Sequence, residues 1–389
     1  MTRSFIFEVS RSLKIPPLFF RPITFLPQIR TRFLLSIFTV FRLFSGPVFH
    51  RIFWLIFLWF GMESCSNAPS EEKRITAAVY HWKTVFQPDS TERSFLHSNA
   101  VRKIYLRFFD VDLKGNEPVP VAAMQKDGDL KGFDVVPVVF ITNRTMAKIN
   151  KDSVSSLAKR IVHKIQNMAR RDSVVIHEIQ LDCDWTATTR KRYFSLIEAV
   201  KNEIKLPVSV TIRLHQVKFS ATTGLPPADR GMLMCYNVGD IRKPETRNSI
   251  FDPGIIHQYL RNLNQYPLEL DLALPMFQWT VVFRNGHFLR ILNQIGQAEI
   301  KVAGCFSEGP KSNTFTAQED TLLFGLSVHR GDEFHVESSR SEDVLAVRNE
   351  VLSQIRNRNI SLTFYHLDSR VLSSFDPSIK NNLYDIPPH

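Results

Sequence analysis

Residues 177–185, HEIQLDCDW, are a short apolar run that carries acidic residues toward its end. Side chains alternate between the two faces of a β-strand, so a strand here places Gln180, Asp182 and Asp184 on one face. Two carboxylates inside an apolar strand are costly to bury unless they are paired or used. This run therefore predicts a strand whose end carries chemistry.

Similar runs, rich in β-branched and aromatic residues, recur along the chain and predict further strands. They are ITAAVYHW (75–82), KIYLRFFDV (103–111), DVVPVVFI (134–141), PVSVTIRLH (207–215), GMLMCYNV (231–238), ELDLALPMFQW (269–279) and ISLTFYHL (360–367). Between several of them apolar residues recur at helical spacing, as at Val154, Leu157, Ile161, Ile165 and Met168. Strands that alternate with helices indicate an α/β fold with a parallel sheet, and eight strands predict closure into a (β/α)8 TIM barrel over residues 75–375.

The connection between the last two predicted strands is too long for a simple loop, so it predicts a small β-rich insertion at about 280–340. Within it, Asn285 and Gly286 lie between two apolar runs. Asn-Gly readily adopts the positive φ angles of a type I′ turn, which predicts a β-hairpin.

The N-terminal region differs in composition from the rest of the chain. Residues 1–64 carry a net charge of +6, which leaves +5 of the total of +11 for the remainder. The apolar run 53–60 is too short to span a bilayer but suits a signal peptide. We therefore expect 1–64 to be a targeting region, or to precede the natural start, and the mature protein to be exported.

The apolar run leads into Met62-Glu63-Ser64-Cys65, which resembles a degenerate bacterial lipobox. In that motif the cysteine becomes the lipidated first residue of the mature protein. The resemblance implies a lipid anchor at Cys65, a tether over 65–74 and a membrane-anchored lipoprotein of the cell envelope. A plain signal peptide or membrane anchor is the alternative.

The remaining charge and the cysteines exclude several classes of function. No run of Lys and Arg with interleaved aromatic residues follows residue 75, so we expect no nucleic-acid partner. No CxxC spacing occurs, so neither a disulfide framework nor a zinc ribbon is indicated. A metal site built on His81, His215 and His366 is an alternative, but without paired histidine spacing we expect no metal and no cofactor.

In a TIM barrel the C-terminal ends of the strands converge on one mouth, where functional residues gather. Aromatic faces and planar hydrogen-bonding groups are what sugar recognition needs, so we expect a carbohydrate ligand. The candidate binding residues at the strand ends are Trp82, Arg107, Asp110, Arg213, Gln278, Trp279 and Tyr365. The alternatives are that the rings pack between barrel and helices, and that the arginines form buried ion pairs with nearby aspartates.

The strand ends resemble those of the chitinase-type, family 18 glycoside hydrolases. That family carries Asp-x-x-Asp-x-Asp-x-Glu on the fourth strand, where the Glu protonates the glycosidic oxygen. Asp182 and Asp184 match the second and third acids, whereas Ile179 replaces the first and Thr186 stands at the acid position.

Three further strand ends continue this resemblance. Met234-Cys235-Tyr236-Asn237 is similar to the family's Met-x-Tyr-Asp/Asn, in which the tyrosine orients the substrate's acetamido group. Leu274-Pro275-Met276-Phe277 is similar to the strand that leads to a substrate-lining aromatic residue, and Phe364-Tyr365-His366 stands where the family has a tryptophan.

The resemblance implies a glycoside hydrolase with Asp182, Asp184 and Tyr236 as catalytic residues. A threonine hydroxyl cannot donate a proton as a carboxylic acid does, so Asp184 would have to assist or replace the missing acid. The alternative is a catalytically inactive glycan-binding lipoprotein, because a barrel can lose one carboxylate and keep its cleft. The sugar, the linkage and the oligomeric state do not follow from the sequence.

Overall fold

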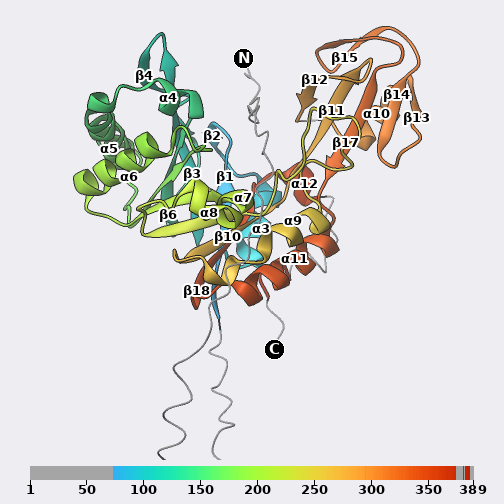
Figure 1. Cartoon of the computed structure of the whole chain (residues 1–389). Helices are drawn as coiled ribbons and strands as arrows, with labels where there is room; N and C mark the ends of the chain where they lie inside the picture. The colour runs from blue at the N-terminus through green and yellow to red at the C-terminus, as the bar shows by residue number, and fades with distance from the viewer. Residues whose placement is uncertain (1–72, 294, 374–379, 381, 386–389) are drawn as a thin grey trace, which may run out of the picture. The chain divides into compact units, whose positions relative to one another are not determined.

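The computed structural model describes residues 73–293, 295–373, 380 and 382–385, and within them eight parallel strands close into a barrel (Figure 1). The strands are β1 (Arg74–His81), β3 (Lys103–Lys114), β6 (Asp134–Ile141), β7 (Ile179–Asp182), β8 (Val208–Arg213), β9 (Arg230–Met234), β10 (Leu270–Pro275) and β18 (Asn359–Tyr365). Closure is complete because β1 pairs in parallel with both β18 and β3. The predicted α/β TIM barrel is confirmed.

Several strands end earlier than the apolar runs that predict them. The ladder of β7 stops at Asp182, and the backbone N–H of Trp185 then donates to the carbonyl of Cys183 at 2.9 Å. The ladder of β9 stops at Met234, and Asn237 adopts a left-handed φ of 54°. The last residues of these runs therefore belong to the loops of the barrel mouth.

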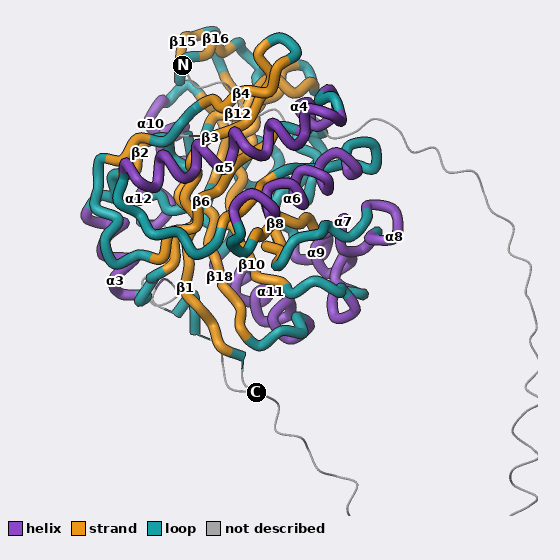
Figure 2. The backbone as a smooth tube through the Cα atoms, turned by 90° about the vertical axis from the view of Figure 1, so that its left-hand side faces the viewer, coloured by secondary structure: helices purple, strands orange, loops and turns teal. Residues whose placement is uncertain are grey.

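Helices cover the outside of the barrel, as Figure 2 shows for α5 and α6. The predicted stripe of α5 is buried at Val154, Leu157, Ile161, Ile165 and Met168. The helices are α3 (Ser90–Ser98), α4 (Asn143–Lys148), α5 (Val154–Arg171), α6 (Arg190–Ile204), α7 (Leu214–Lys218), α8 (Ser220–Thr223), α9 (Pro253–Leu260), α10 (Gln297–Ala303), α11 (Ser341–Gln354) and α12 (Ser369–Leu372), with short 3₁₀ turns at Lys151–Ser153 and Leu263–Gln265.

A second sheet lies between β10 and β18 in the chain and has its own small apolar core. Its antiparallel strands run in the order β12 (His287–Leu292), β11 (Gln278–Arg284), β17 (Glu333–Ser338), β14 (Thr314–Ala317) and β13 (Phe306–Glu308). Asn285 and Gly286 join β11 to β12 with φ angles of 51° and 73°, as the predicted hairpin turn requires. We call the segment 278–338 the insertion.

Short strands complete the fold. β4 (Glu117–Val121) extends β3 as an antiparallel hairpin, β2 (Val85–Phe86) pairs with β5 (Gln125–Lys126), and β15 (Thr321–Leu323) pairs with β16 (Leu326–Val328).

The N-terminal end of the barrel interior is closed by ion pairs. Lys103 Nζ lies 2.8 Å from Glu178 Oε2, and Arg230 Nη2 lies 2.9 Å from Asp271 Oδ1. A site is therefore expected at the opposite end of the barrel, where the C-terminal ends of the strands and the loops that follow them meet. We call this end the mouth.

None of the helices in the described residues is both long enough and apolar enough to cross a membrane. The apolar run 53–60 and Cys65 lie outside the described residues.

Candidate functional site at the barrel mouth

Asp182 lies at the end of β7, facing the barrel axis, and its residue is only 7% exposed. The hydroxyl of Thr211, on the neighbouring β8, donates to Asp182 Oδ1 at 2.7 Å. Burial, together with the neighbouring Asp184, raises the pKa of Asp182 from 3.8 to about 7. Asp182 therefore carries a proton for much of the time near neutral pH.

Both candidate arginines are ion-paired. Arg213 donates through Nε and Nη2 to the two oxygens of Asp184, the second at 3.2 Å. Arg107 donates to both oxygens of Asp110, with Nε 2.7 Å from Oδ1. Burial raises the pKa of Asp110, although Arg107 opposes the rise. The ion-pair alternative for these arginines is therefore what the structure shows.

Aromatic rings line the mouth around Tyr365. The ring of Tyr236 stacks on it at a centroid distance of 5.2 Å, and the rings of Phe277 and Trp82 approach it at 5.5 Å and 5.6 Å. The guanidinium of Arg107 lies 5.7 Å from the centre of the Trp82 ring. The four rings and the Arg107 guanidinium make one surface that carries both apolar faces and hydrogen-bonding edges; we call it the aromatic mouth.

Tyr236 has a buried hydroxyl that makes no hydrogen bond within the described part of the chain. Burial raises its pKa well above 10, so the hydroxyl stays protonated. A buried donor without a partner costs free energy unless a water or a ligand satisfies it. The Tyr236 hydroxyl is therefore a group that a ligand could satisfy, as is the neighbouring Asn237 Oδ1, which is also buried without a partner among the described residues.

The first two residues of the insertion, Gln278 and Trp279, point in opposite directions. The Trp279 ring packs edge-on against Phe277 at 5.3 Å, and its indole N–H donates to Glu337 Oε2 at 2.8 Å. The Gln278 side chain extends toward Gly296, the residue that precedes α10, where its amide fills the space beside the glycine backbone. Trp279 thus extends the aromatic mouth, whereas Gln278 lies beside the start of α10.

Thr186, which the resemblance in the sequence aligns with an acid, belongs to the turn before α6. Its hydroxyl lies 2.9 Å from that of Thr188 and 3.3 Å from that of Thr189. Its backbone N–H donates to Thr189 Oγ1 at 2.9 Å. The turn is held by hydroxyls that hydrogen-bond to one another, and no carboxyl side chain stands at this position.

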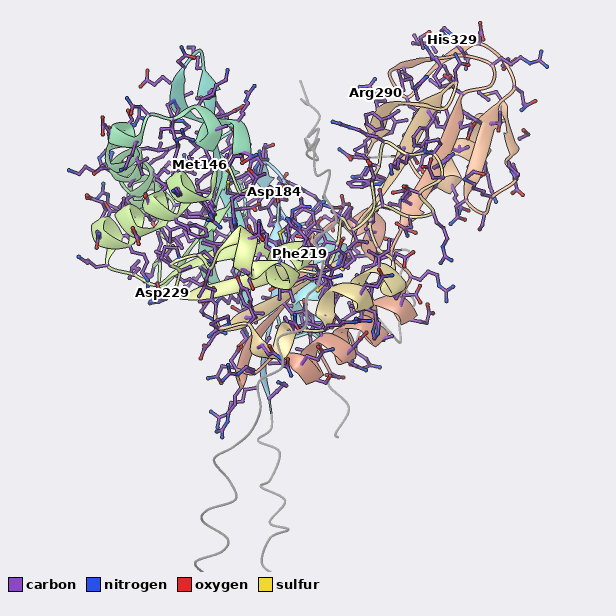
Figure 3. The ribbon with its side chains drawn as sticks, viewed as in Figure 1. Met146, Asp184, Phe219, Asp229, Arg290 and His329 are labelled. Carbon is purple, nitrogen blue, oxygen red and sulfur yellow. The ribbon has the colours of Figure 1, made fainter. Side chains whose placement is uncertain are left out.

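Three other acids were candidates for a proton donor at the mouth, and each could serve only if it lies there. Asp271 lies at the opposite end of the barrel with Arg230, and Asp368 caps α12 and pairs with Arg370 at 2.9 Å. Asp110 does lie at the mouth, where its charge raises the pKa of Asp182. In Figure 3 Asp184 marks the mouth end of β7, and Arg290 and His329 mark the far part of the insertion.

The histidines do not gather into a metal site. His81 packs on Phe86 at 4.9 Å, next to His366, and burial lowers their pKa values to about 3 and about 4. His215 lies on α7, where burial and then Arg213 lower its pKa. Within residues 73–385, as far as they are described, no three His, Cys, Asp or Glu side chains are placed to hold a metal ion.

Three side chains at or below the mouth were not among the predicted site residues. Phe277 packs between Tyr236 and Trp279, Thr211 contacts Asp182, and Gln180 Oε1 accepts from the hydroxyl of Tyr80 at 2.5 Å. Strand alternation was the available signal for Thr211, because it lies two residues before Arg213 on the same face.

The aromatic mouth is packed with its own rings and ion pairs. Two surface hollows lie elsewhere, one of about 380 Å³ against α5 and one of about 240 Å³ in the loop 308–315. Trp82 and Tyr365 are only partly buried, so a ligand can reach these rings from the surface, whereas contact with the buried Tyr236 hydroxyl requires the rings to move.

Comparisons with known proteins support the fold. No family model and no curated protein sequence matches the chain. Among solved structures, the C-terminal domain of a candidate chitinase from Desulfitobacterium hafniense is 13% identical, with a TM-score of 0.52 over 80% of this chain and 100% of that one. A chitinase from Chromobacterium violaceum is 12% identical, with a TM-score of 0.48 over 80% and 99%. A spore cortex-lytic enzyme from Bacillus cereus is 12% identical, with a TM-score of 0.46 over 77% and 74%.

Proposed function

We propose that this protein binds carbohydrate at the aromatic mouth and does not cleave it. The observation that carries the proposal is the combination of stacked rings with Thr186 at the acid position. Glycoside hydrolysis needs a carboxylic acid that protonates the leaving oxygen, and Thr186 cannot supply that proton. Rings and planar polar groups suffice for binding without cleavage.

The mouth is suited to sugars that carry an acetamido group. A pyranose ring presents an apolar C–H face, which the rings of Trp82 and Tyr365 can cover, and a polar rim that Arg107 and Asp110 can meet. The unpartnered hydroxyl of Tyr236 can hydrogen-bond to an amide oxygen. This matches the role that the chitinase-type resemblance implies for that tyrosine.

Calorimetry with a panel of glycans, including a tetrasaccharide of N-acetylglucosamine, tests the proposal. We expect binding by the wild type, and a loss of about fivefold in affinity on Tyr365→Ala, because an aromatic contact contributes about 1 kcal/mol. Phe288→Ala, which removes a ring of the insertion, is the control and should leave affinity unchanged. No binding to any glycan, or equal losses in both variants, would contradict the proposal.

A hydrolase with a relocated acid is the second candidate, and the raised pKa values of Asp110 and Asp182 favour it. A carboxyl that keeps its proton near neutral pH is what a general acid requires. Release of shorter sugars, abolished by Asp110→Asn or Asp182→Asn, would establish this function. Intact glycans after long incubation with binding protein would exclude it.

We also propose that the protein is exported and anchored through Cys65. The apolar run 53–60 and the following Met62-Glu63-Ser64-Cys65 support this proposal. Labelling with a radioactive fatty acid in a bacterial host should mark the wild type but not Cys65→Ser. Equal labelling, or no labelling of either, would contradict an anchor at this cysteine.

A further inference from the structure

Helix α5 carries an unusual charge distribution for a surface helix. Its sequence, VSSLAKRIVHKIQNMARR, holds five Lys or Arg residues, one His and no acidic residue. Its apolar stripe is buried against the barrel, so the exposed face presents Lys159, His163 and Arg170. This face lies on the outside of the barrel, where Figure 2 shows α5 in full length.

Only part of this positive charge is compensated by nearby acids. Arg171 pairs with Asp172 at 2.7 Å, and Arg160 pairs with Glu117 at 2.9 Å. Lys159, Lys164 and Arg170 make no ion pair within the described residues, although Lys164 Nζ lies 5.4 Å from the centre of the Phe109 ring. Three cations therefore remain to attract an anion.

A surface hollow of about 380 Å³ lies against this face. It is lined by His163, Lys164, Asn167, Met168 and Arg171. The lysine, the arginine and the asparagine amide all offer N–H donors, which suits the oxygens of a phosphate group.

An exposed apolar residue stands next to the cations. Val175 is 71% exposed and follows the C-terminus of α5 within the loop 172–178. That loop leads into β7, so it lies at the N-terminal end of the barrel, where β1 also begins. Cations beside a protruding apolar side chain favour a lipid interface over a dissolved polyanion, which offers nothing apolar to contact.

We propose that α5 and the loop 172–178, together the α5 face, dock on a membrane of anionic phospholipid. The phosphate headgroups would meet Lys159, Lys164 and Arg170, and Val175 would enter the apolar boundary. One further argument rests on the proposed lipid anchor. The eight residues 66–73 span at most about 28 Å, so an anchor at Cys65 would keep this end of the barrel near the membrane.

Vesicle co-sedimentation of the full chain carrying Cys65→Ser tests the α5 face without any contribution from lipidation. Binding is measured to vesicles of phosphatidylglycerol and phosphatidylcholine and to vesicles of phosphatidylcholine alone. The apolar run 53–60 should contribute equally to both, so the difference in affinity reports on the anionic headgroups. The test variant is Lys159→Gln/Lys164→Gln/Arg170→Gln. The control, Lys191→Gln/Lys243→Gln/Arg330→Gln, loses the same charge from exposed sites elsewhere.

We expect the wild type to bind anionic vesicles more tightly than neutral ones. The test variant should bind anionic vesicles on the order of a hundredfold more weakly, because each lost cation should weaken binding about fivefold. The control should lose far less, and Val175→Ser should weaken binding to anionic vesicles. Equal losses in test and control, no preference for anionic vesicles, or binding of dextran sulfate in place of vesicles would overturn the proposal. Carbohydrate affinity, measured on the same variants, reports separately on the proposed function.

Discussion

Replacing Asp182 with Asn should stabilise the folded protein, and the gain should grow with pH. Asp182 is buried at the mouth, and its pKa is raised from 3.8 to about 7. Above pH 3.8 the unfolded chain releases this proton, whereas the folded protein keeps it until about pH 7. The buried carboxyl therefore lowers the free energy of unfolding, and this loss grows as the pH rises from 3.8 to about 7 and is constant above that.

The size of the effect follows from the width of the window. A tenfold change in proton affinity corresponds to about 1.4 kcal/mol. Between pH 5 and pH 7 the folded protein retains a proton that the unfolded chain has lost, which amounts to roughly 3 kcal/mol over two pH units. Asn has nearly the shape of Asp and can still accept the hydrogen bond from Thr211.

Urea unfolding of wild type and Asp182→Asn at pH 5, 6, 7 and 8 measures this difference. The free energy of unfolding of the variant should gain roughly 3 kcal/mol on the wild type between pH 5 and pH 8. Asp332→Asn is the control, because the Arg284 side chain lowers the pKa of Asp332 and its loss should cost the same at every pH from 5 to 8. A difference between wild type and Asp182→Asn that does not change with pH would refute the burial argument.

Other predictions concern the buried His81, the contact between Trp279 and Glu337, and the ion pair between Arg213 and Asp184. Because His81 is buried with a pKa of about 3, the fold loses stability as the pH falls below 6.5, and His81→Leu should remove roughly 2 kcal/mol of the loss between pH 6.5 and pH 5 in urea unfolding. Glu337→Leu removes the acceptor that the Trp279 indole shares with the backbone N–H and the hydroxyl of Ser249, and it should cost roughly 2 to 3 kcal/mol by the same assay; a neutral effect would show that these contacts are unimportant. Arg213→Gln should cost roughly 1 to 3 kcal/mol, and adding Asp184→Asn should recover part of it, whereas strictly additive losses would argue against the pair.

The barrel could be predicted because its signals are local and repeated. Each strand is a run of β-branched and aromatic residues, and the stripe of α5 from Val154 to Met168 has helical spacing. The ends of the strands were less predictable. Asp184 and Trp185 continue the apolar run of β7, but the backbone leaves the ladder after Asp182 to form the mouth loop.

The alternation of side chains along the strands was enough to predict which residues lie at the mouth, but it could not predict which groups they contact. Alternation placed Asp182 on the inner face of its strand, and nothing local in the sequence could choose between ligand contact and the ion pair that joins Asp184 to Arg213. Gln278 and Trp279 are adjacent at the end of one apolar run, yet they point to opposite sides because a new strand, β11, begins there. Such outcomes depend on distant parts of the chain, such as Glu337, that meet only in the folded state.

The location and the integrity of a bound sugar test the central claim most directly. A crystal structure of the protein soaked with a tetrasaccharide of N-acetylglucosamine would show both at once. The account predicts an intact tetrasaccharide lying on the rings of Trp82 and Tyr365, with an amide oxygen at the Tyr236 hydroxyl. A cleaved sugar at the mouth, or a sugar bound elsewhere while the mouth stays empty, would contradict it.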